Sequence, residues 1–110
     1  MRIVLACADA ENADWLAHVL GEDGLSVVVL PSIEPNSPEL KGAELLIVDG
    51  GSAAGLGDAG PSKRVLLADR GSTIDLSAVQ GRFADIIVVP APAEEVVARV
   101  RHVMGRNVKP

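Results

Sequence analysis

Ala43-Glu44-Leu45-Leu46-Ile47-Val48-Asp49 is a mainly apolar run that ends in a carboxylate, and the glycine-rich residues 50–55 follow it directly. Strands that read as continuous apolar runs belong to sheets that are covered on both faces, and such sheets are mostly parallel. Ligands of open parallel sheets bind outside the carboxyl ends of the strands. Asp49 is therefore the first candidate functional residue, and its neighbours determine what it can do.

Four further apolar runs accompany this one, and all five are rich in Val, Leu or Ile. They are too short for free-standing helices, and most are bounded by Gly, Pro or Asp, which commonly flank strands. We therefore predict strands at Ile3–Ala8, Leu25–Leu30, Ala43–Val48, Val65–Ala68 and Asp85–Val89.

Helical patterns lie between and after these runs. In Glu11–Leu20 the apolar residues recur on one face, which is typical of a helix packed on a sheet. The last segment has Pro92 near its first turn, acidic residues at its start, basic residues near its end and Gly105 as its stop. Ser72–Gln80 predicts a weaker helix, and Pro38–Gly42 has room for about one helical turn or a loop.

The alternation of strands and helices predicts an α/β fold, a three-layer sandwich whose parallel five-stranded sheet has the order 2-1-3-4-5. Gly50–Lys63 is rich in glycine and has no amphipathic period, so the crossover after the third strand is expected to be shortened or irregular. We predict one domain over residues 1–105, with the start of a linker or tail at 106–110.

The composition excludes several classes of partner. The chain has one Trp, one Phe, no Tyr and a net charge of -5, which argues against stacking on bases or following phosphates, so direct binding to nucleic acid is not expected. No apolar run approaches the length of a membrane span. Cys7 is the only cysteine, which excludes an intrachain disulfide and is compatible with a reducing compartment, so we expect a cytoplasmic protein.

Taken together, Arg2-Ile3-Val4-Leu5, the first helix, Glu44–Asp49, Val89-Pro90 and the helix that begins with Glu94-Glu95 resemble the receiver domain (CheY-like) of two-component response regulators. This resemblance implies the flavodoxin-like fold. It also implies that Asp49 occupies the position that accepts a phosphoryl group from a histidine kinase. The family surrounds that position with a pair of acidic Mg²⁺ ligands after strand one, a Ser or Thr after strand four and a Lys after strand five.

At these supporting positions the sequence departs from the family pattern. The acidic pair falls on Cys7 and Ala8, the hydroxyl on Ala68 and the lysine on Val89, while the aromatic residue of strand five falls on Ile86 or Ile87. Asp9 lies beside the lost pair, and Asp69 would repel a phosphoryl group. We therefore expect a pseudo-receiver with no catalytic residues, no cofactor and no bound metal; the alternative is a poor Mg²⁺ site made by the acidic residues Asp9, Asp49 and Asp69.

The resemblance also implies how such a domain acts. The usual contact surface of the family maps to Ser72–Gln80, Ile86–Val89 and Glu94–Met104, and its polar residues here are Glu95, Arg99 and His102. The leading hypothesis is a non-enzymatic signalling module that binds a kinase, an output domain or a second copy of itself. Two alternatives remain open: an atypical receiver that is phosphorylated on Asp49, and a sensor that binds a nucleotide second messenger near Gly50–Gly60.

The sequence also allows a purely structural role for Asp49. A carboxylate beside a glycine-rich turn commonly accepts backbone N–H groups of that turn. In that case Asp49 is a retained structural residue that marks the ancestry of the fold.

Overall fold

The sheet has five parallel strands in the order β2-β1-β3-β4-β5, as the sequence predicts. The computed structural model describes residues 2–50, 56, 60–61, 63–69 and 83–105. Apolar runs of four to six residues form the strands, and the central ones are buried on both faces, which is why they show no alternation in the sequence. The strands are β1 (Arg2–Ala6), β2 (Ser26–Leu30), β3 (Leu45–Asp49), β4 (Arg64–Asp69) and β5 (Asp85–Val89).

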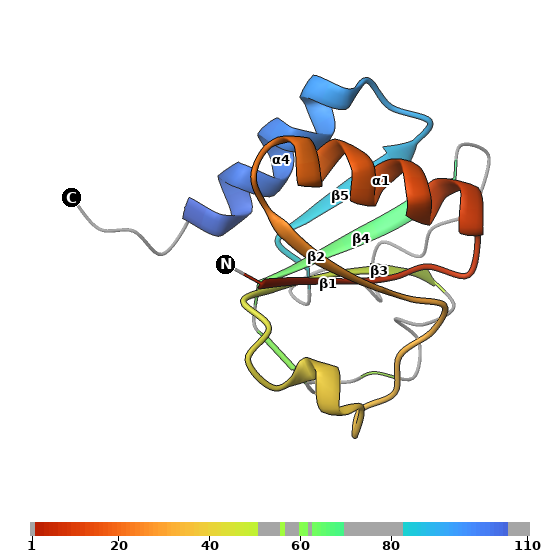
Figure 1. Cartoon of the computed structure of the whole chain (residues 1–110), viewed down its shortest axis with the longest axis vertical. Coiled ribbons are helices and arrows are strands. Elements are labelled where there is room, and N and C mark those ends of the chain that lie inside the picture. Colours follow the sequence, from red (N-terminus) through yellow and green to blue (C-terminus); the bar gives the residue numbers. More distant parts are fainter. Residues whose placement is uncertain (1, 51–55, 57–59, 62, 70–82, 106–110) are drawn as a thin grey trace.

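Two helices, α1 (Ala10–Glu22) and α4 (Ala93–Gly105), cover one face of the sheet (Figure 1). α1 begins where Asp9 caps it, and α4 begins after Pro92 with two glutamates in its first turn. Their apolar stripes pack on alternate residues of the strands and form the larger core. The predicted stripes are confirmed, with Trp15, Val97 and Met104 only partly buried at their margins.

The connection between β2 and β3 lies on the opposite face (Figure 1), and among the described residues Leu56 also packs into the core on this face. Residues 31–44 contain a single 3-10 turn, η1 (Pro38–Leu40), where the sequence left room for one helical turn or a loop. Ile33 and Leu40 from this connection pack against Val4, Ala6, Leu46 and Val48 of the sheet. Gly60 lies against Leu40 with a φ of +84°, so the chain before β4 approaches η1 closely.

Several predicted features lie outside the described residues: the helix Ser72–Gln80, most of the crossover Gly50–Lys63 and the tail 106–110. Within the part of the chain that the structure describes, no helix is long and apolar enough to cross a membrane.

Candidate functional site

The parallel register brings the candidate residues together at the carboxyl edge of the sheet. β1 ends beside β3, with Ala6 opposite Val48, and Asp49 lies opposite Leu67 of β4. Asp69 ends β4 opposite Val89, the last residue of β5. The chain therefore places Asp49, Asp69 and the loop that follows β1 at one edge, as expected for the strand ends of a parallel sheet.

Asp49 is half-buried, and its carboxylate bonds to the loop after β1. Its Oδ2 atom accepts the backbone N–H of Ala8 at 2.8 Å. The sequence suggested the glycine-rich turn as the source of such a bond, and residues 51–55 of that turn lie outside those described. The structure adds a donor that the sequence did not reveal, because it is a main-chain group brought close only by the pairing of β1 with β3.

Asp9 and Asp69 are linked through a third residue, Asn12. Asp9 caps α1, where its Oδ1 atom accepts the N–H of Asn12 at 3.1 Å. The side-chain amide of Asn12 donates to Oδ1 of Asp69 at 3.4 Å. Sequence reasoning missed Asn12, although an Asp directly before a helix is a capping signal, and its side chain commonly accepts the N–H of the residue three positions later, which would have indicated the first of these bonds.

Cys7 lies close enough to these three acids for their charges to act on its thiol, and it is buried, with 4% of its surface exposed. Burial raises the pKa of its thiol, a backbone hydrogen bond with Asp9 opposes this, and the negative charges of Asp49, Asp9 and Asp69 raise the pKa further. Sγ also donates to the carbonyl of Asp9 at 3.5 Å, a bond that only the protonated thiol can make. The thiol is therefore kept protonated and neutral at neutral pH. It supplies no oxygen ligand and no negative charge to a hard cation.

Two further departures from the receiver pattern, at the ends of β4 and β5, are apolar and buried. Ala68 and Val89 are 8% and 3% exposed, so each contributes to the packing of the sheet end and neither offers a polar atom in its side chain. Val89 precedes Pro90 through a cis peptide bond. Among the described residues, no group of three or more His, Cys, Asp or Glu side chains is placed to hold a metal ion.

The predicted contact surface lies away from this edge, on α4 and β5. The side chain of Arg99 is 42% exposed, and Asp85 holds its guanidinium group: Nη1 donates to Oδ1 and Oδ2 of Asp85 at 2.9 and 3.1 Å. Its Nε atom lies 3.7 Å from Glu95. His102 is exposed on the same helix, and Val88 of β5 is 40% exposed. The segment Ser72–Gln80 of this predicted surface lies outside the described residues.

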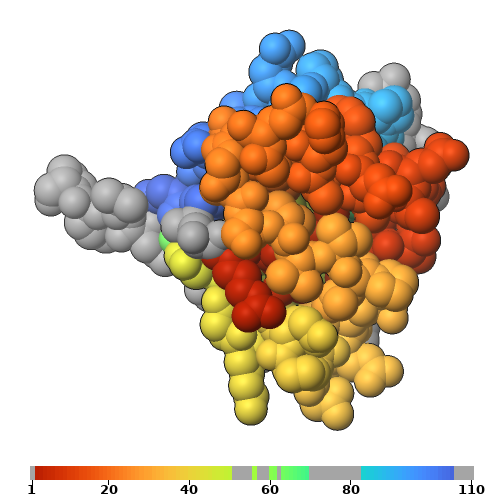
Figure 2. Space-filling model, viewed as in Figure 1, coloured from red at the N-terminus to blue at the C-terminus, as the bar shows by residue number. Residues whose placement is uncertain are grey.

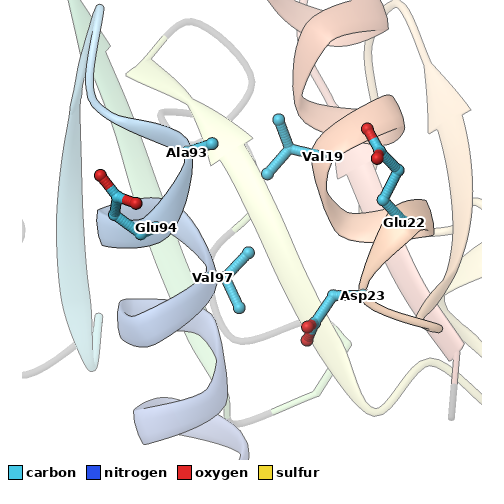
Figure 3. A pocket seen from close by; sticks show the side chains of 6 residues that line it. All are labelled: Val19, Glu22, Asp23, Ala93, Glu94 and Val97. Atoms are coloured by element: carbon cyan, nitrogen blue, oxygen red, sulfur yellow. The ribbon is translucent and has the colours of Figure 1, made fainter.

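A cleft of about 240 Å³ lies between α1 and α4, and no local pattern in the sequence indicates it. Figure 3 shows Val19 and Ala93 facing each other across the cleft, with Val97 beside Asp23. Its acidic lining residues include Asp23, which pairs with Arg101, and Glu22, which pairs with His18. Glu94 completes the lining.

The fold has many solved counterparts. No protein-family model matches the sequence, and no curated protein does. The receiver domain of NtrX from Brucella abortus superposes with a TM-score of 0.76 at 14% identity, over 96% of this chain and 99% of that one. A response regulator from Thermotoga maritima superposes with a TM-score of 0.71 at 17% identity, over 94% and 97%.

A protein from Burkholderia thailandensis assigned to pilus assembly, cpaE, superposes with a TM-score of 0.74 at 16% identity, over 96% and 99%. A longer NtrX chain from Brucella abortus superposes on 94% of this chain, but this chain spans only 26% of the length of that one. The fold of the chain is thus that of response-regulator receiver domains, the CheY-like variant of the flavodoxin-like fold.

Proposed function

We propose that the chain is a phosphorylation-independent signalling module, a pseudo-receiver that acts by binding another protein. The main observation in support of this proposal is the hydrogen bond that the Asp49 side chain makes. Its carboxylate accepts the main-chain N–H of Ala8. In a receiver domain, the residue at the position of Ala8 carries a second carboxylate, which helps to hold Mg²⁺. The acceptor position is kept, while the supporting positions Ala8, Ala68 and Val89 carry no carboxylate, hydroxyl or ammonium group.

Phosphoryl transfer depends on charge stabilisation more than on covalent chemistry by the protein. The transferred group needs positive charge or hydrogen-bond donors around its oxygens. Ala8, Ala68 and Val89 provide none from their side chains, and Asp69 adds negative charge at the neighbouring strand end. The weak S–H donor of Cys7 is buried and turned toward the carbonyl of Asp9. Losing one such donor costs roughly 10² to 10³ in rate, so losing several leaves little catalysis. The chain is therefore expected to work without Mg²⁺ and without an enzymatic activity of its own.

The surface proposed for the partner combines Glu95, Arg99 and His102 of α4 with the exposed edge of β5. Asp85 and Glu95 hold Arg99 in one orientation, which lowers the entropy that its long side chain loses on binding. Val88 adds an exposed apolar side chain. This mixture of an anchored arginine with apolar area is common at protein interfaces. The partner is a kinase, an output domain or a second copy of the chain, in the cytoplasm.

Incubation with Mg²⁺ and a small phosphoryl donor, followed by intact mass measurement, tests the loss of phosphorylation. The wild-type chain should stay unmodified. The Ala8→Asp variant, which restores an acidic pair with Asp9 at an exposed position, serves as the comparison. A phosphoryl adduct on the wild type that disappears in Asp49→Asn would instead establish the alternative, an atypical receiver that is phosphorylated on Asp49.

The binding surface needs a separate test. Affinity capture from an extract of the source organism is compared for the wild type, Arg99→Glu and Glu11→Lys, which changes an exposed charge on α1. A protein retained by the wild type and by Glu11→Lys but lost from Arg99→Glu would support the α4 surface. Equal capture by all three chains would contradict it.

A further inference from the structure

The outer edge of the sheet at β2 is open and uncharged. β2 reads Ser26-Val27-Val28-Val29-Leu30, and it is an end strand, paired only with β1. Figure 2 shows this strand at the surface, in the band between α1 and the connection formed by residues 31–44. Val29 has 40% of its surface exposed, which makes it one of the two most exposed large apolar residues described.

Two residues of β2 have main-chain N–H and C=O groups that point away from the sheet. The carbonyl of Leu30 accepts the N–H of Cys7 at 3.0 Å, so the polar groups of Leu30 point toward β1. Main-chain groups alternate in direction along a strand, which turns those of Ser26 and Val28 toward β1 as well and those of Val27 and Val29 away from it. No hydrogen bond between described residues reaches the outward N–H and C=O groups of Val27 and Val29.

Natural sheets usually protect such an edge with charged side chains, proline or a bulge. β2 has none of these within its bounds, and four of its five residues are Val or Leu. The opposite edge differs, because β5 begins with Asp85, whose carboxylate is paired with Arg99. Of the two end strands, β2 is therefore the one with no charged residue within its bounds, and its composition favours strand pairing.

We propose that a second copy of this chain pairs along β2, antiparallel to the first, with the two-fold axis passing beside Val28. In this register Val27 of each copy exchanges N–H···O=C bonds with Val29 of the other. The two copies then form about four hydrogen bonds and satisfy every outward group of Val27 and Val29. The two sheets become one continuous sheet.

A second copy is favoured over another strand because the edge is self-complementary. The outward groups lie symmetrically on either side of Val28, so a two-fold copy meets each donor with an acceptor, as an isologous interface requires. Residues that exchange hydrogen bonds across an antiparallel pair have side chains on the same face. Val29 of one copy therefore packs against Val27 of the other, which covers the exposed valine. This inference does not rest on the proposed function, since its tests measure association and not phosphorylation.

Sedimentation equilibrium over a range of concentrations tests the dimer, with Val29→Pro as the decisive variant. Proline removes the outward N–H of Val29 and leaves the hydrogen bonds to β1, which is why proline is tolerated on edge strands. The wild type should dimerise, and the dissociation constant of Val29→Pro should rise by at least about tenfold because two of the four bonds are lost. Glu11→Lys, which changes an exposed charge on α1 outside both proposed surfaces, should dimerise like the wild type.

Two further variants keep the test decisive. If Val29→Pro does not fold, Val29→Lys retains the N–H but places a charge against Val27 of the second copy, and it should weaken the dimer similarly. In a Cys7→Ala background, Val28→Cys should form an intermolecular disulfide across the two-fold axis, whereas Val29→Cys should not. A monomeric wild type, a folded Val29→Pro that dimerises normally, or cross-linking through position 29 and not 28 would overturn the proposal.

Discussion

The carboxylate of Asp49 accepts the main-chain N–H of Ala8 at 2.8 Å, and these two residues are 41 positions apart in the sequence. The bond joins the end of β3 to the loop that leads from β1 into α1. Asp49 therefore has a structural task that does not depend on phosphorylation. The same carboxylate contributes to the raised pKa of the Cys7 thiol.

Two substitutions of Asp49 distinguish the effect of its hydrogen bond on stability from the effect of its negative charge. Asp49→Asn keeps an oxygen acceptor for Ala8 and removes one of three neighbouring negative charges, so its free energy of unfolding should stay within about 0.5 kcal/mol of the wild type. Asp49→Ala loses the acceptor and should be about 1 kcal/mol less stable than Asp49→Asn. Urea unfolding of the three proteins measures both differences. Equal stability of the Asn and Ala variants would show that the bond contributes nothing.

Cys7 should make the stability of the protein depend on pH in the alkaline range. Burial, followed by the nearby carboxylates, raises its pKa above the ordinary value of 9.0, so the folded chain holds this proton when the unfolded chain has already released it. The stabilisation from Cys7 is complete below pH 9.0 and is lost as the pH rises toward the folded-state pKa. Denaturant unfolding on both sides of pH 9.0 should show a steeper loss in the wild type than in Cys7→Ala. Parallel losses would contradict this.

Gly60 and Gly42 form a matched pair for testing the close contact between η1 and the chain before β4. Both have positive φ angles, +84° and +80°, so alanine is strained at either position. A Cβ at Gly60 would also lie 2.8 Å from Cδ2 of Leu40, whereas nothing lies within 4 Å at Gly42. Leu40 is buried and has little freedom to move. Thermal unfolding should show Gly60→Ala to be less stable than Gly42→Ala by about 1 kcal/mol; equal losses would mean that Leu40 moves aside freely.

The sheet could be predicted from the sequence because its signals are local. Runs such as Leu45–Val48 are buried on both faces, and each is bounded by residues that end strands. Short strands joined by helices then allow few arrangements, and the order β2-β1-β3-β4-β5 follows from right-handed crossovers. The limits of α1 were harder to predict: the helix extends to Glu22, beyond the apolar residue Leu20, because the exposed residues Gly21 and Glu22 continue its last turn.

The candidate site was predicted only in part, for a physical reason. The sequence shows which side chains stand at the strand ends, and therefore identified Asp49, Asp9 and Asp69. It does not show the main-chain N–H of Ala8 or the amide of Asn12 as their partners, because these contacts arise only when distant segments pack. The cleft between α1 and α4 is likewise a property of helix packing and leaves no local pattern.

The ion pair of Arg99 with Asp85 should matter more for binding than for stability. Arg99 is 42% exposed, so solvent screens the pair, and Arg99→Met should lower the free energy of unfolding by roughly 0.5 kcal/mol. A partner that binds the α4 surface should lose at least about tenfold in affinity, because Arg99 then loses both its charge and its fixed orientation. Calorimetry with a captured partner measures this effect. An affinity unchanged by Arg99→Met would place the binding surface elsewhere.

Lys63 should stabilise the end of α4 from a distance. Its Nζ atom donates to the carbonyl of Met104 at 2.6 Å in a partly buried setting, next to the point where the helix ends at Gly105. A cation there satisfies a carbonyl that has no partner within the helix and favours the negative end of the helix dipole. Lys63→Met keeps most of the aliphatic stem and should lower the free energy of unfolding by about 1 kcal/mol. Lys41→Met removes the same charge from an exposed residue and is the matched control, expected to change stability by less than about 0.5 kcal/mol. Hydrogen exchange should locate the loss in the last turn of α4, and faster exchange spread evenly over the chain would argue against a local role for Lys63.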